Sequence, residues 1–298
     1  MVIRVGTRKS PLAMYQAKHV VNLLAEIEPT AEFEIIGIDS KGDLDQSESL
    51  FKIGGQGIFV NTIRQALVER RVDIVVHSAK DIPGGTIENI TIGAYPLRAD
   101  VRDVLIGKSL SQLTPGDIVR TGSARRMLQM AVSIPGLLFE ELRGNIATRM
   151  SKIPSGGSII VAKAALDRLN IVPENSEVLS TEVMLPQIGQ GAIAVETEAS
   201  NVGLLELLSE INNRETSDAL TIERGFLNAV GSDCSWPVGG WARYDGNDHV
   251  FEFIAMLGNL ERNLIIRTKF SVSESSDLDS FGATCAVELM DLAKSQGF

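Results

Sequence analysis

The residue pair best suited to catalysis in this sequence is Lys80 followed by Asp81. A strand-like apolar run, 72–77, leads directly into the pair. Both side chains should therefore lie at the carboxyl end of a strand, where open sheets bind their ligands. A carboxylate in that position can hold a positively charged nitrogen and stabilise a cationic intermediate. The residue types alone leave a second interpretation open, in which the two side chains form an ordinary surface ion pair.

Arginine accounts for 18 of the 28 basic residues. Its guanidinium captures carboxylates and phosphates through two parallel hydrogen bonds. Isolated arginines are commonly solvated surface charges, but some here follow strand-like runs beside expected helix N-termini, and that position favours anion binding. The sequence therefore predicts a site for a small polyanion, with Arg8, Arg125, Arg126, Arg143, Arg149 and Arg168 as candidates.

Cys234 lies within 231–240, a segment of small residues and proline that is typical of an exposed loop. A nucleophilic or covalently modified thiol needs access rather than burial. A free cysteine is more commonly a small buried side chain, and that alternative stays open, although the loop favours a functional thiol. Cys285 stands in an amphipathic segment and is predicted to belong to a helix core.

Strand-like and helix-like segments alternate over the first two-thirds of the chain, which predicts an α/β fold with helices on both faces of open sheets. Ser10 and Pro11 mark the start of the first helix, because serine is a preferred N-cap and proline fits the first turn. Expected strands cover 2–6, 32–39, 72–77, 90–95, 118–121, 137–142 and 158–162, and expected helices cover 11–27, 57–71, 123–133, a segment from 145 and one ending at 169.

Four polar clusters follow expected strands, at 6–10, 77–81, 121–126 and 142–145. Because ligands of such sheets bind at the carboxyl ends of strands, these clusters are expected to line one cleft between two sub-domains. The pattern changes near 215 to a helix, a loop, an antiparallel pair and a last helix, which predicts a smaller α+β domain. The expected domains are 1–96 with 190–210, then 97–189, and finally 211–298, which carries the Cys234 loop.

Composition and charge exclude several functional classes. The net charge is −10, and residues 199–298 hold 15 acidic residues against 7 basic ones, which argues against nucleic acid as a partner. No apolar run approaches the roughly 20 residues of a membrane span. Two cysteines and no signal-peptide pattern fit a cytoplasmic protein, and three histidines without ligand spacing argue against a metal site.

Taken together, these motifs resemble the porphobilinogen deaminase family along nearly the whole chain and in the family's order. So many ordered motifs make coincidence implausible. The matching segments are Gly-Thr-Arg-Lys-Ser-Pro-Leu-Ala (6–13), Lys-Gly-Asp (41–43), Gly-Gly-Gln-Gly-Ile-Phe (54–59), His-Ser-Ala-Lys-Asp-Ile-Pro (77–83), Arg-Asp (102–103), Gly-Ser-Ala-Arg-Arg (122–126), Arg-Gly-Asn-Ile-Ala-Thr-Arg (143–149), Leu-Pro-Gln-Ile-Gly-Gln-Gly-Ala (185–192) and the Cys234 loop.

The resemblance implies two doubly wound domains like type II periplasmic binding proteins, plus a smaller C-terminal α+β domain. It implies a monomeric transferase that adds four porphobilinogen molecules head to tail to a dipyrromethane cofactor, with loss of ammonia, and then releases hydroxymethylbilane by hydrolysis. The cofactor would be joined to Cys234 by a thioether, and Asp81 matches the family's catalytic aspartate. Cofactor-binding positions match Lys80, Asp81, Ser123, Arg125, Arg126 and Arg143, and substrate-binding positions match Arg8, Ser10, Arg149 and Arg168.

The sequence departs from the family pattern at a few positions. None of these changes removes the aspartate, the cysteine or the paired arginines, so activity is expected. The departures are Gly231-Ser232-Asp233 in place of Glu-Gly-Gly, Ser235 in place of Gln, Gln56 where Lys is common, Gly122 in place of Ser, and Lys163 and Ala165 in the segment ahead of Arg168.

Two rival functions remain. One is a two-lobed binding module that captures a small dianion without reacting with it; simple binding would need neither the Cys234 loop nor a third domain. The other is a phosphate-ester enzyme that uses the arginine cluster. Such an enzyme needs a metal or an activated nucleophile, and the sequence contains no convincing set of ligands.

Overall fold

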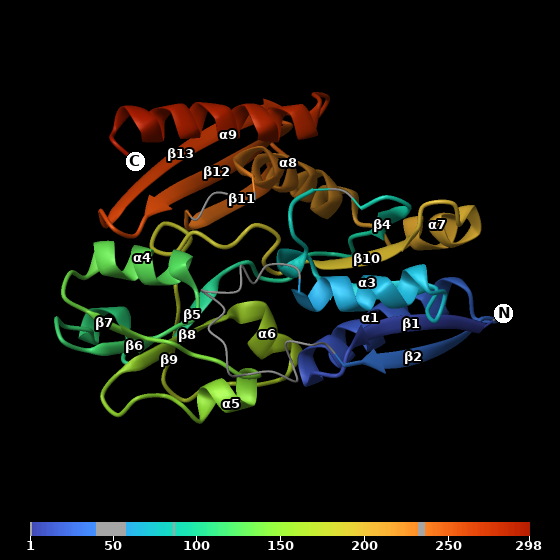
Figure 1. The fold of residues 1–298 in the computed structure, drawn as a ribbon, viewed down its shortest axis with the longest axis horizontal. Coiled ribbons are helices and arrows are strands. Elements are labelled where there is room, and N and C mark those ends of the chain that lie inside the picture. The colour runs from blue at the N-terminus through green and yellow to red at the C-terminus, as the bar shows by residue number, and fades with distance from the viewer. Residues whose placement is uncertain (1, 40–57, 86, 232–235) are drawn as a thin grey trace. The chain divides into compact units, whose positions relative to one another are not determined.

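The computed structural model describes residues 2–39, 58–85, 87–231 and 236–298. Cys234, the Lys-Gly-Asp segment 41–43 and most of the segment 54–59 lie outside the described residues. The chain divides into two compact units: unit 1 comprises Met1–Ala99 and Ala192–Ser217, and unit 2 comprises Asp100–Gly191 and Asp218–Phe298. Figure 1 labels most of the elements of both units.

Unit 1 contains a five-stranded sheet with the order β2-β1-β3-β10-β4. β1 runs parallel to β2 and β3, whereas β10 is antiparallel to both of its neighbours. Parallel neighbours bring their carboxyl ends to the same edge of a sheet, so the residues that follow β1 and β3 lie close together. The strands are β1 (Val2–Arg8), β2 (Glu32–Ile38), β3 (Ile74–Ser78), β4 (Ile90–Ala94) and β10 (Ile193–Glu198).

Helices cover both faces of this sheet. Ile74 and Val76 pack on α1 (Pro11–Ile27) and α7 (Val202–Ser209), whereas Val75 points to the opposite face and packs on α3 (Ile58–Val68). The alternation follows from the two-residue period of a strand. The predicted start of α1 is confirmed, because Ser10 is its N-cap and its side chain accepts a hydrogen bond from the backbone N–H of Ala13.

Unit 2 begins with a second five-stranded sheet, whose order is β7-β6-β8-β5-β9. β6 runs parallel to β7 and β8, and β5 is antiparallel to β8 and β9. The elements are β5 (Asp103–Gly107), β6 (Ile118–Arg120), α4 (Ala124–Ser133), β7 (Leu138–Glu140), α5 (Ile146–Met150), β8 (Ser158–Ala162), α6 (Lys163–Arg168) and β9 (Ser176–Val178).

The two sheets share one connectivity. β10 occupies in the first sheet the place that β5 occupies in the second, and each is the only strand in its sheet that runs antiparallel to both neighbours among the described strands. β5 follows β4 in the chain, and β10 follows β9. In both cases the preceding strand belongs to the other unit, so each antiparallel strand is the first strand that the chain forms after it passes from one unit to the other. The expected fold class, with two open α/β sheets, is confirmed.

The C-terminal part of unit 2 has the expected α+β character. β11 (Val238–Asp245), β12 (Val250–Asn259) and β13 (Leu264–Ser273) form an antiparallel sheet that packs on α8 (Arg214–Val230) and α9 (Leu278–Ser295). The antiparallel pair and the last helix were predicted, but β11 was not, because its two glycines and the preceding proline are typical of a loop. None of the helices within the described ranges combines the length and apolar character that a membrane span requires.

Candidate active site

A small pocket in unit 1 collects the residues that follow β1 and β3. Its volume is about 60 Å³, and its lining includes Arg8, Ser10 and Asp81. Arg8 is the last residue of β1, and Ser10 caps α1 directly after it. Asp81 ends η1 (Ala79–Asp81), a single 3-10 turn that follows β3. The parallel pairing of β1 and β3 therefore brings three predicted site residues to one pocket.

The backbone of η1 is fixed to the sheet. The Ala79 N–H donates to the carbonyl of Ala192 at 3.0 Å, and the Ile82 N–H closes the turn on the carbonyl of Ala79 at 3.2 Å. Asp81 is exposed, and Lys80 is half-buried. The carboxylate thus stands at the end of a rigid turn and can meet a ligand from solution.

Sequence reasoning missed two polar residues of this pocket, Gln16 and Ser78. The Gln16 side chain is 2% exposed, and its Nε2 donates to Ser78 Oγ at 2.8 Å. Gln16 lies six residues after Ser10 on α1, at a position that belongs to the helix's buried stripe. A polar amide on an otherwise apolar stripe was the available signal, since buried polar groups need hydrogen-bond partners.

A buried ion pair lies beside the pocket. Arg64 on α3 donates from Nε and Nη2 to the two carboxylate oxygens of Glu196 on β10, at 2.8 and 2.5 Å. His77, which lines the pocket, brings its Nε2 to 3.4 Å from Glu196 Oε2. Burial alone would raise the pKa of Glu196, but the hydrogen bonds from Arg64 and the nearby His77 ring lower it to about 2. Glu196 is therefore ionised at neutral pH.

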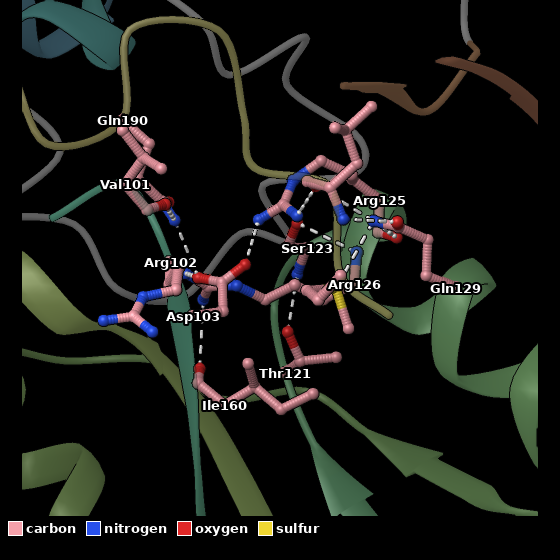
Figure 2. A network of polar contacts seen from close by, with 12 residues as sticks. Val101, Arg102, Asp103, Thr121, Ser123, Arg125, Arg126, Gln129, Ile160 and Gln190 are labelled. Carbon is pink, nitrogen blue, oxygen red and sulfur yellow. Dashed lines mark hydrogen bonds and ion pairs between the residues drawn. The ribbon is translucent and has the colours of Figure 1, made fainter. Parts of the chain in front are cut away.

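In unit 2 the predicted arginine pair lies at the start of α4. Ser123 is the N-cap of this helix, and its Oγ accepts a hydrogen bond from the Arg126 N–H at 3.4 Å. Both Arg125 and Arg126 are buried, and both form ion pairs with the carboxylate of Asp103 (Figure 2). Burial alone would raise the pKa of Asp103, but the two guanidinium groups lower it well below its ordinary value.

The other predicted arginines of unit 2 contact backbone or nearby acids. Arg143, in the loop after β7, pairs with Glu141 at 2.7 Å. Arg149 on α5 donates to the carbonyl of Gly144 at 2.8 Å, and Arg168 at the end of α6 donates to the carbonyl of Gly191 at 2.7 Å. Arg143 and Arg149 thus belong to one loop and the helix that follows it, whereas Arg168 holds the segment that leads to β10.

The structure therefore brings six of the predicted residues together in two groups, one in each unit, and leaves Lys80, Arg143, Arg149 and Arg168 outside them. Arg8, Ser10 and Asp81 share the pocket of unit 1. The cluster of Ser123 with the arginine pair belongs to unit 2. Over the part of the chain that the structure describes, no group of His, Cys, Asp and Glu side chains is arranged to hold a metal ion.

Comparison with known sequences decides the family. A sequence model described as the dipyrromethane cofactor binding domain of porphobilinogen deaminase matches residues 3–206, and the model of that family's C-terminal domain matches residues 217–291. The chain belongs to the porphobilinogen deaminase family. The porphobilinogen deaminase of Bacillus pumilus (strain SAFR-032) is 38% identical over 295 residues, which cover 97% of this chain and 94% of that protein.

Other members of the porphobilinogen deaminase family are similarly close. The enzyme of Brevibacillus brevis is 41% identical over 252 residues, which cover 83% of this chain and 82% of that protein. The enzyme of Bacillus subtilis (strain 168) is 37% identical over 295 residues, which cover 97% of this chain and 93% of that protein. The family resemblance inferred from the motifs is thereby confirmed.

The residues of unit 2 fit the cofactor that the family model names. A dipyrromethane made from porphobilinogen carries acetate and propionate carboxylates, so its protein partners should be hydrogen-bond donors with positive charge. Arg125 and Arg126 contribute two positive charges against the single negative charge of Asp103. Their Nε atoms are buried and have no hydrogen-bond partner within the described residues. The surplus charge and the unused donors match the chemistry of a carboxylate.

Proposed function

We propose that this chain catalyses the stepwise, head-to-tail condensation of four porphobilinogen molecules and then releases hydroxymethylbilane by hydrolysis, which makes it a transferase of tetrapyrrole biosynthesis. The observation that carries the proposal is family membership over nearly the whole chain, combined with a pocket that holds Arg8, Ser10 and Asp81. The dipyrromethane, joined to Cys234 through a thioether, supplies the primer to which the substrates are added.

Arg8 and Ser10 are suited to bind the carboxylates of porphobilinogen. Each porphobilinogen carries one acetate and one propionate, and a guanidinium binds such groups with two parallel hydrogen bonds. Ser10 Oγ accepts a bond from the Ala13 N–H at 3.3 Å, which leaves its own proton free to be donated to an anion. The N-terminus of α1, with its positive dipole end, adds to the attraction.

Asp81 is assigned the catalytic role. Each cycle breaks the bond between the aminomethyl carbon and nitrogen of porphobilinogen, so that ammonia leaves and the carbon becomes cationic. The free α-carbon of the terminal pyrrole then forms the new bond and loses its proton. A carboxylate at the end of a rigid turn can interact with the departing ammonium group and stabilise the positive charge as it develops on the pyrrole.

Five residues are proposed to hold the cofactor carboxylates: Lys80, Ser123, Arg125, Arg126 and Arg143. Arg149 and Arg168 are proposed to bind substrate together with Arg8 and Ser10. We further propose the functional domains predicted from the sequence, 1–96 with 190–210, 97–189 and 211–298; three separate sheets and the family's C-terminal match at 217–291 support this division. A monomeric, cytoplasmic enzyme is part of the proposal, since two cysteines fit a reducing compartment.

The function is tested by Asp81→Asn. The amide has nearly the same shape but no charge, so turnover should fall at least about a hundredfold, as when one stabilising charge is lost from an active site. Ammonia release and tetrapyrrole formation are the measurements, and far-UV circular dichroism checks the fold. Because Asp81 is exposed, the fold should be unchanged. A near-normal rate of ammonia release would refute the assigned role.

The cofactor attachment is tested by mass spectrometry of the intact protein. The wild-type chain should exceed its sequence mass by two pyrrole units, and Cys234→Ala should not. Cys285→Ala is the matched control, because that thiol is buried in α9 and should leave the added mass unchanged. A wild-type chain that stays at its plain sequence mass after incubation with porphobilinogen would instead favour a non-reacting binding module.

A further inference from the structure

Asp103 occupies an unusual place for a carboxylate. It is the first residue of β5 and is fully buried, and carboxylates are almost never fully buried unless they are paired. Its Oδ2 accepts from Arg125 Nη2, and its Oδ1 accepts from Arg126 Nη2, both at 2.7 Å. One carboxylate is therefore shared between two adjacent cations (Figure 2).

The remaining contacts of the two guanidinium groups fix their orientation. Arg125 Nη1 donates to the carbonyl of Leu185, and Arg126 Nη1 donates to the carbonyl of Ile160 at 3.0 Å. Each guanidinium is thus held at its two terminal nitrogens. The two Nε atoms have no hydrogen-bond partner within the described residues. One carboxylate against two guanidinium groups leaves this cluster with a net positive charge.

Gln190 fixes Asp103 in turn. Its Nε2 donates to Asp103 Oδ1 at 2.9 Å and to the carbonyl of Val101 at 2.8 Å. Gln190 itself is fully buried. The carboxylate therefore accepts three hydrogen bonds from side chains on two different segments, α4 and the segment before β10, which leaves it little freedom to turn away when a second carboxylate approaches.

We infer that Asp103 is the positioning residue of the arginine pair: it holds Arg125 and Arg126 side by side, against their mutual repulsion, in the geometry that receives the cofactor carboxylates. The inference rests on the proposed function. A purely competitive role, in which Asp103 blocks the guanidinium groups, predicts the opposite effect of its removal, so the two roles can be distinguished by the direction of the effect.

The test is Asp103→Asn. An amide has one acceptor oxygen, and its NH₂ group would face a guanidinium N–H, so the side chain can hold only one of the two arginines. We expect the cofactor-free chain, incubated with porphobilinogen, to gain the mass of two pyrrole units at least about tenfold more slowly than wild type, which corresponds to ~1.4 kcal/mol. The rate is normalised to the folded fraction measured by circular dichroism.

The matched control is Asp73→Asn. Asp73 also accepts two hydrogen bonds from one guanidinium, Arg4 Nε at 3.0 Å and Nη2 at 2.7 Å, but it lies just before β3 in unit 1, outside the proposed cofactor residues. The Asp73→Asn chain should gain mass at the wild-type rate. Asp103→Glu, which restores the charge, should recover part of the rate. If Asp103→Asn does not fold, Gln190→Met is the second variant. It keeps both ion pairs but removes the hydrogen bond from Gln190 to the Asp103 carboxylate, so the rate of mass gain should fall two- to threefold.

Two outcomes would overturn the inference in distinguishable ways. If folded Asp103→Asn gains mass as fast as wild type or faster, the positioning role is wrong while the proposed function stands. If the wild-type chain itself gains no mass from porphobilinogen, the proposed function fails, and this inference fails with it.

Discussion

The buried pair of Glu196 and Arg64 links the stability of unit 1 in acid to the charge of the Glu196 carboxylate. Glu196 is 1% exposed and accepts two hydrogen bonds from Arg64. Replacing it by glutamine removes the charge and leaves the Arg64 guanidinium buried without an anionic partner. Breaking a buried pair in this way is strongly destabilising, because the remaining charge stays desolvated.

The magnitude follows from the pKa of Glu196, which falls from an ordinary 4.5 to about 2. A difference of roughly 2.5 pKa units contributes about 3 kcal/mol to the free energy of unfolding. Because the pKa is lower in the folded protein, this stabilisation is fully present above pH 4.5 and is lost as the pH falls toward 2. At pH 3 about 2 kcal/mol of it should already be gone.

The assay is urea unfolding of wild type and Glu196→Gln at pH 7 and pH 3. Circular dichroism should be used, because both tryptophans, Trp236 and Trp241, belong to unit 2 and do not report on unit 1. The gap in unfolding free energy between the two proteins should shrink by about 2 kcal/mol at the lower pH. Glu261→Gln, an exposed acid-to-amide change, should show no such shrinkage. An equal Glu196 gap at both pH values would refute the reasoning.

Three further predictions concern unit 2 and α7. Burial raises the pKa of the Cys285 thiol to about 12, so in the folded protein at pH 8 this thiol should not react with a thiol reagent, whereas it should react fully in denaturant. Gly282 lies where α9 touches α8, and an added Cβ would stand 2.9 Å from the Phe226 nitrogen, so Gly282→Ala should cost about 1–3 kcal/mol in thermal unfolding. Gly203→Ala on α7, where nothing lies within 4 Å, should instead stabilise by about 0.5–1 kcal/mol.

Local sequence signals predicted many of the strands and helices. The apolar run at 158–162 became the fully buried β8, and Ser10 with Pro11 correctly marked the start of α1. β5 and β10 were missed, although both are central in their sheets. Each carries a buried acid, Asp103 or Glu196, and an acid in an apolar run argues against a buried strand until its distant arginine partner is known.

The candidate site could be predicted only in part, because local signals mark strand ends but not partners that are distant in the sequence. The sequence placed Arg8, Ser10 and Asp81 at strand ends, and the parallel pairing of β1 and β3 brings them to one pocket. The partners of the arginine pair could not be predicted, because Asp103 and Gln190 are separated from it by 22 to 65 residues in the sequence. Long-range polar contacts of this kind leave no local pattern.

Two of the buried acids, Glu196 and Asp103, are placed in the same way. Glu196 lies on β10 and Asp103 on β5, the antiparallel strands that occupy equivalent places in the two sheets. Each acid pairs with arginines from a helix of its own unit, α3 or α4. In unit 1 one carboxylate meets one guanidinium, so these two charges balance each other, and His77 stands beside the pair. In unit 2 one carboxylate meets two guanidinium groups, and this surplus of positive charge supports the proposal that the second sheet binds a polyanion.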